Sequence, residues 1–208
     1  GMWIPMLLQN NEQDMQEMGM NITAEDIYSI NHSSMKDAVV LFDGGCTGEI
    51  VSNQGLLLTN HHCGFDWIQY HSTVEHDYLT HGFWAMSKEE ELPCPGISAV
   101  MLKSMEDVTD RVLEGVTKET SNDERAEIVT ENIKKIKEDA EANSDYQVVI
   151  KSFYHGNKYY MIYNEVFKDV RLVGAPPSNI GKFGGDTDNW VWPRHTGDFS
   201  IVSIYVYP

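Results

Sequence analysis

Hydrophobic and polar positions fall into short runs that are rich in β-branched and aromatic residues and are bounded by turn-forming residues, as in β-strands. These runs predict strands over Ala38–Phe42, Glu49–Val51, Leu56–Thr59, Ile97–Leu102, Tyr146–Phe153, Tyr159–Phe167, Asp169–Val173 and Phe199–Tyr207. The pattern therefore favours a mainly β fold with added helices.

Two segments carry helix-start signals. Thr23 with Asp26, and Ser121 with Glu124, have the spacing of a capping box. After the second box one helical face stays apolar to about residue 142, at Val129, Ile133, Ile136 and Ala140. The aromatic and histidine-rich stretch at 64–82 shows no clean period, and the Gly/Pro/Asn-rich stretch at 175–194 predicts a loop.

The segment from Cys46 to Cys63 predicts a hairpin that delivers His62 to the end of its second strand. The ends of a hairpin lie side by side, so a disulfide between Cys46 and Cys63 is geometrically natural. Such a bridge implies an oxidising compartment, whereas the alternative is two free thiols in a reducing one. Cys94 is left over, and we expect it to be free and structural.

Charge and composition exclude several classes of protein. The 208 residues include 15 basic and 32 acidic side chains, which gives a net charge of −17 and argues against nucleic acid as a partner. No apolar run approaches the ~20 residues of a membrane helix, so no membrane insertion is expected. The histidines between 61 and 81 match no zinc spacing, and the glycines at 181–185 match no phosphate loop. We therefore expect neither metal nor cofactor.

A histidine held rigidly at a hairpin end suits a general base, which needs a buried carboxylate to orient it. Asp198, which leads directly into an apolar strand, is the best candidate, with Asp186 and Asp188 as competitors. The plain alternative for Asp198 is a turn residue at a strand start. His62 fits the base better than His61, for which we expect a supporting or packing role.

No serine in this chain has the glycine-flanked setting of an acyl-transfer nucleophile, so the chain alone is expected to be inactive. Asn189 and Trp190 place a polar and a flat apolar group near the candidate acid, a pairing that suits binding the end of a peptide. The alternative is a loop anchored by a buried tryptophan.

Five motifs resemble the bacterial dipeptidyl-peptidases of serine peptidase family 46, over residues 1–207. They are Gly-Cys-Thr-Gly-Glu-Ile at 45–50, Leu-Thr-Asn-His-His-Cys-Gly at 58–64, Ser-Thr-Val-Glu-His-Asp-Tyr-Leu-Thr at 72–80, Gly-Phe-Trp-Ala-Met at 82–86 and Phe-Gly-Gly-Asp-Thr-Asp-Asn-Trp-Val-Trp-Pro-Arg-His-Thr-Gly-Asp-Phe-Ser at 183–200. The resemblance implies a chymotrypsin-like double β-barrel with an inserted helical domain, of which residues 1–208 would form the N-terminal part of the catalytic domain, with an incomplete first barrel.

The resemblance also implies roles for individual residues. His62 and Asp198 match the catalytic histidine and aspartate. Asn189 matches the asparagine that anchors the substrate's free amine, and Trp190 matches the tryptophan beside it, which is also expected to bind substrate. The nucleophilic serine would lie beyond residue 208. The implied activity is release of dipeptides from free peptide N-termini, by a homodimer in the periplasm or at the cell surface.

Two other functions are compatible with the residues. The first is a non-catalytic peptide-binding or interaction domain that kept the barrel and lost the serine, and the second is an ordinary trypsin-like endopeptidase. The sequence does not give the preferred side chain before the scissile bond, because the residues of that pocket would lie outside the chain.

Overall fold

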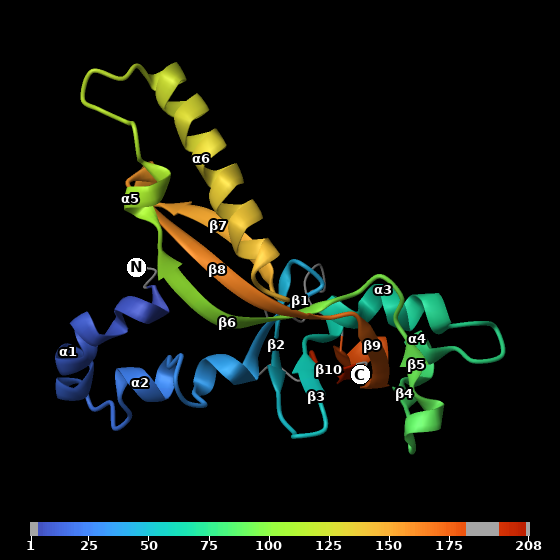
Figure 1. Ribbon diagram of the computed structural model, residues 1–208. Helices are drawn as coiled ribbons and strands as arrows, with labels where there is room; N and C mark the ends of the chain where they lie inside the picture. The colour runs from blue at the N-terminus through green and yellow to red at the C-terminus, as the bar shows by residue number, and fades with distance from the viewer. Residues whose placement is uncertain (1–3, 182–195, 207–208) are drawn as a thin grey trace. The chain divides into compact units, whose positions relative to one another are not determined.

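The computed structural model describes residues 4–181 and 196–206, which form two units (Figure 1). Unit 1 comprises the described residues up to Lys36 together with Leu102–Val166, and unit 2 comprises Asp37–Met101 and the described residues from Phe167 onward. Each unit has its own hydrophobic core. The fold is mainly antiparallel β with added helices, as the sequence predicted.

Unit 2 is built on short antiparallel strands. Its elements are β1 (Val39–Phe42), β2 (Cys46–Ile50), β3 (Leu56–Thr59), α3 (His61–His71), α4 (Tyr78–His81), β4 (Phe83–Trp84), β5 (Leu92–Pro93), the start of β6 (Ala99–Asp107), β9 (Asp169–Ala175), α7 (Ser178–Gly181) and β10 (Ser200–Tyr205), with 3₁₀ turns at Met35–Ala38 and Lys88–Glu90. The strands run in the order β4, β9, β10, β3, β2, β1, β6, with β5 also paired to β9. This arrangement is consistent with a partial chymotrypsin-like barrel.

The core of unit 2 forms where the inward faces of these strands meet α3. Phe42, Leu57, Leu172 and Ile68 are completely buried, three of them on strands and the last on α3. Burial of side chains of this size contributes about 1.5–3 kcal/mol each. The core therefore fixes α3, the helix that carries the candidate base, against the sheet.

The β2–β3 hairpin turns at a glycine that cannot be replaced without strain. Gly55 has a φ of +82°, and a Cβ there would collide with the carbonyl oxygen of Ile204 on β10. The same glycine accepts a hydrogen bond from the Ile204 backbone N–H at 2.9 Å. The hairpin tip is therefore packed directly on β10, the strand that follows the candidate acid.

Unit 1 combines a β-hairpin, formed by β7 and β8, with the helix that the sequence predicts after Ser121. Its elements are α1 (Glu12–Glu17), α2 (Ala24–Ile27), the rest of β6, α5 (Thr109–Val112), α6 (Asn122–Ala142), β7 (Gln147–Phe153) and β8 (Lys158–Phe167), with 3₁₀ turns at Pro5–Asn11 and Tyr154–Gly156. Figure 1 shows α6 lying along the β7–β8 hairpin. Ile136 and Ala140 are buried on that side, with Val129 and Ile133 partly buried beside them, so the predicted apolar face is confirmed.

Several sequence predictions hold to within a few residues. Both capping boxes are formed, and the helix after Ser121 ends at Ala142 as expected. Two were wrong in detail: the loop expected after Ala175 contains α7, and β6 continues five residues beyond Leu102. None of the helices in the described part of the chain has both the length and the apolar character that a transmembrane span requires.

Cys94 is a free cysteine, as expected, and it is only 2% exposed. Burial raises the pKa of its thiol to about 11, so at pH 8 the thiolate, which is the form that attacks alkylating reagents, is almost absent. We predict that iodoacetamide labels Cys94 in the folded protein at least about a hundredfold more slowly than in the unfolded protein. Peptide mass spectrometry at pH 8, with and without denaturant, measures both rates, and equal labelling would contradict the burial described here.

Candidate active site

The candidate base stands at the start of a helix. Strand β3 ends at Thr59, Asn60 is extended with φ −73° and ψ 154°, and α3 begins at His61. His62 is therefore the second residue of α3, and the prediction that it ends a strand was wrong. The sequence analysis did not predict this helix, because the helix has no regular apolar period. Its stability rests on packing, with Gly64 and Ile68 buried against the core.

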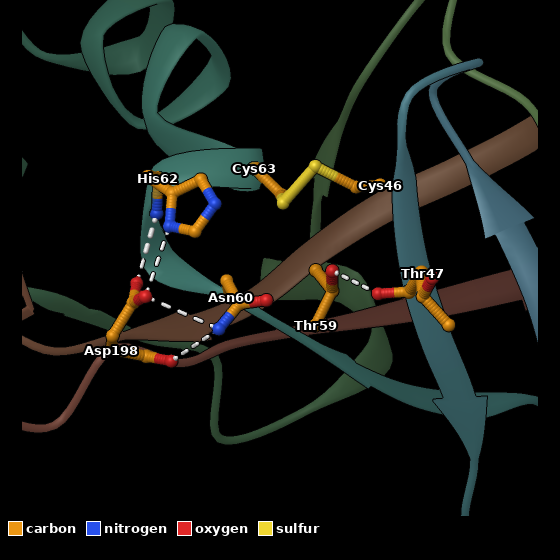
Figure 2. A network of polar contacts seen from close by, with 7 residues as sticks. All are labelled: Cys46, Thr47, Thr59, Asn60, His62, Cys63 and Asp198. Carbon is orange, nitrogen blue, oxygen red and sulfur yellow. Dashed lines mark hydrogen bonds and ion pairs between the residues drawn. A yellow bond between two sulfur atoms is a disulfide. The ribbon is translucent and has the colours of Figure 1, made fainter. Parts of the chain in front are cut away.

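The predicted disulfide between Cys46 and Cys63 is present and joins the first residue of β2 to the first turn of α3. The hydroxyl of Thr59 adds a second link, because it donates a hydrogen bond to the backbone carbonyl of Thr47 at 2.9 Å (Figure 2). His62 is the immediate neighbour of the bridged Cys63. Its backbone is therefore fixed to β2 by a covalent bond one residue away.

Asp198 contacts the candidate base through both carboxylate oxygens. Its Oδ2 lies 2.9 Å from Nδ1 of His62, and its Oδ1 accepts the backbone N–H of His62 at 3.2 Å (Figure 2). The Asp198 side chain is 12% exposed, and that of His62 is 43% exposed. The structure thus brings together two residues that are 136 positions apart in the sequence.

The position of Asp198 at the N-terminus of α3 explains how a carboxylate is held there. The first backbone N–H groups of a helix have no partner inside the helix, and they favour negative charge. With Nδ1 facing the carboxylate, the imidazole can exchange protons through Nε2, while the carboxylate stabilises the imidazolium that forms. This geometry suits a general base that later acts as a general acid.

His61 lies in the core, unlike the partly exposed His62. It is completely buried, its ring meets the edge of Phe65, and a Cβ at Gly181 would collide with it. Within the described residues neither ring nitrogen has a partner with hydrogen-bond geometry, and burial lowers the pKa of this imidazole. His61 is therefore a neutral packing residue, in line with the role expected for it.

The other predicted site residues cannot be placed. Asn189 and Trp190, and the competing acids Asp186 and Asp188, lie outside the described residues. Their roles remain predictions. Asp198 is the acid that the described structure brings to His62.

One cluster within the described ranges has metal-ligand geometry, formed by Cys46, His62 and Cys63. Its two sulfur atoms are bonded to each other, so they cannot act as thiolate ligands while the bridge is intact. His71, a member of the histidine-rich stretch, instead has Nε2 2.8 Å from the backbone carbonyl of Pro93.

Sequence reasoning missed one residue of the site. The side-chain amide of Asn60 donates to Oδ2 of Asp198 at 3.2 Å and to the backbone carbonyl of Asp198 at 3.3 Å. The signal for it was local, since an asparagine between a strand and a helix is a common helix cap. Only the fold shows that its amide is directed to Asp198.

The antiparallel sheet, with a histidine held by a carboxylate beside a disulfide, is consistent with part of a chymotrypsin-like barrel. The sequence pattern that describes the peptidase S46 family matches residues 1–208, and the chain belongs to this family.

Relatives and solved structures agree with that assignment. The chain is 57% identical to the Asp/Glu-specific dipeptidyl-peptidase of Flavobacterium psychrophilum and 48% identical to dipeptidyl-peptidase 7 of Capnocytophaga gingivalis, over 99% of this chain and 29% of each relative. The crystal structure of Porphyromonas endodontalis DPP11 in complex with the dipeptide Arg-Glu superposes with a TM-score of 0.83 at 51% identity, over 99% of this chain and 31% of that one. The chain thus spans just under a third of the length of these proteins.

The disulfide closes a loop between residues 17 positions apart, which restricts the unfolded chain. We predict that replacing both cysteines, as Cys46→Ala with Cys63→Ala, lowers the free energy of unfolding by about 3 kcal/mol and lowers the thermal midpoint. Adding a dithiol should lower the midpoint of the parent protein and leave the double variant unchanged. A double variant as stable as its parent would contradict this prediction.

Proposed function

We propose that the protein is a serine-type dipeptidyl-peptidase, and that residues 1–208 form the N-terminal part of its catalytic domain. The observation that supports this most directly is the 2.9 Å contact between Nδ1 of His62 and Oδ2 of Asp198. The dipeptidyl-peptidase activity named for the relatives supports the reaction class. The nucleophilic serine is proposed to lie outside this chain, since no serine here has a nucleophile's setting.

In the proposed mechanism, Nε2 of His62 takes the proton of the serine hydroxyl as the serine attacks the peptide carbonyl. His62 then gives this proton to the departing amine, and the cycle repeats with water to release the dipeptide. Asp198 stays ionised and stabilises the imidazolium form. Asn189 is proposed to bind the substrate's free ammonium group, which would limit cleavage to the second peptide bond, and Trp190 is proposed to bind substrate beside it.

The proposed substrate specificity and cellular location rest on two further observations. The Asp/Glu specificity named for the 57% identical relative makes an acidic residue before the scissile bond our proposal for this protein. A disulfide beside the base supports action in the periplasm or at the cell surface, because such bridges persist in oxidising compartments. We also propose that the full-length protein works as a homodimer.

The test uses the full-length protein and fluorogenic dipeptides ending in Glu or Leu, each with a free and an acetylated N-terminus. We expect cleavage of the free-amine forms only, with Glu preferred over Leu. His62→Ala should lower kcat by at least about 10⁴-fold, because no other group replaces the base. His32→Ala, which removes an exposed histidine, is the matched control and should leave kcat unchanged.

Each alternative outcome points to a different function. Equal cleavage of acetylated peptides would indicate an endopeptidase and remove the proposed role of Asn189. Binding of free-amine peptides without any cleavage would favour a non-catalytic peptide-binding domain. Preference for Leu over Glu would overturn only the proposed specificity.

A further inference from the structure

Asn60 occupies a capping position without acting as a cap. It precedes α3 with extended backbone angles, and its carbonyl accepts hydrogen bonds from the N–H groups of Cys63 and Gly64. An asparagine side chain at this position normally accepts from the first turn of the helix. Here no such bond is formed within the described residues. The amide points instead to Asp198, as Figure 2 shows.

The amide of Asn60 holds both the side chain and the main chain of Asp198. Its nitrogen donates to Oδ2 at 3.2 Å and to the backbone carbonyl at 3.3 Å. A side-chain amide has two N–H donors, so it can serve both acceptors at once. Because one amide binds both the carboxylate and the backbone carbonyl of Asp198, rotation about the Cα–Cβ bond of Asp198 is restricted.

Asp198 needs such a restraint because of where it lies. Residues 196–199 have no regular secondary structure, and β10 begins only at Ser200. The backbone on either side is held by two bonds, from Gly197 N–H to the Ile180 carbonyl and from Phe199 N–H to the Gly197 carbonyl. Neither bond fixes the direction of the Asp198 carboxylate.

The first turn of α3 is capped by this carboxylate, because Oδ1 accepts the N–H of His62. Asp198 thus caps the helix, and Asn60 orients Asp198. Oδ2 receives Asn60 on one side and Nδ1 of His62 on the other.

We propose that Asn60 is a positioning residue of the peptidase reaction, which acts by orienting the Asp198 carboxylate toward His62. The inference rests on the proposed function for its kinetic consequences. Its geometric basis, the two bonds from one amide to Asp198, does not depend on that function.

The test compares Asn60→Ala with Asn60→Asp in the full-length protein. Asn60→Ala removes the two bonds, so kcat should fall about tenfold while KM changes less than about twofold. Asn60→Asp keeps the shape but sets a second carboxylate against Oδ2 of Asp198, so kcat should fall about a hundredfold. The aspartate variant is therefore expected to be the worse enzyme.

A purely structural role predicts the reverse order. Asparagine and aspartate cap helices about equally well, and alanine caps them poorly. If Asn60 were only a helix cap, Asn60→Asp would keep its activity and its thermal midpoint, and Asn60→Ala would lose both. That order overturns the proposal. Asn53→Asp is the matched control, since it makes the same charge change at an exposed turn of unit 2 and should leave kcat unchanged.

The pH profile gives a second kinetic readout. A second carboxylate beside the pair favours the protonated imidazole, so the acidic limb of kcat/KM should move up by about one pH unit in Asn60→Asp. His61 also interacts electrostatically with Asp198, which raises the pKa of its imidazole, and with His62, but burial is the larger effect and lowers that pKa. An unmoved limb in this variant would count against the proposal.

A readout without substrate separates this inference from the proposed function. Diethyl pyrocarbonate modifies neutral imidazole, and mass spectrometry of the peptide that contains His62 gives the rate at that residue. At pH 6.5 the rate should be several-fold lower in Asn60→Asp than in the parent or in Asn53→Asp. If no protein cleaves dipeptides but this difference is found, the proposed function fails and the positioning role stands. Equal rates in all three proteins overturn the positioning role.

Discussion

The site depends on one carboxylate placed at the start of one helix. Asp198 accepts the first-turn N–H of α3 through Oδ1 and contacts Nδ1 of His62 through Oδ2. The same group thus satisfies a backbone donor that the helix leaves open and orients the imidazole that the helix carries. The other features described above, which are the disulfide, the hairpin packed on β10 and the amide of Asn60, hold one or the other side of this contact.

Two adjacent histidines on α3 have different environments and therefore different chemical properties. Successive residues of a helix point about 100° apart, so His61 enters the core while His62 stays partly exposed. His61 is kept neutral by burial, and His62 is placed against an acid. A strand would have sent them to opposite faces, but without the open N–H groups that receive Asp198.

Local signals in the sequence were enough for the hairpin, the long helix α6 and the disulfide, because turn residues, a capping box and paired cysteines act over short distances. The pairing of His62 with Asp198 was also predicted, first from the position of Asp198 at the start of an apolar strand, with Asp186 and Asp188 as competitors, and then from the resemblance. Helix α3 and the direction of the Asn60 amide were not predicted. Both depend on contacts with the core or with a residue more than 130 positions away, and neither leaves a periodic trace in the sequence.

The order of residues along the chain determines when the His62–Asp198 pair can form. The helix that bears His62 is complete by residue 71, whereas Asp198 follows only after all of Leu102–Val166, the C-terminal segment of unit 1, has been made. Chains are synthesised from the N-terminus, and contacts between distant residues form late in folding. A nascent chain therefore holds the imidazole of His62 without its acid until residue 198 has been made. Unit 2 is thus completed only when the second of its two segments, the one that brings Asp198, has been synthesised.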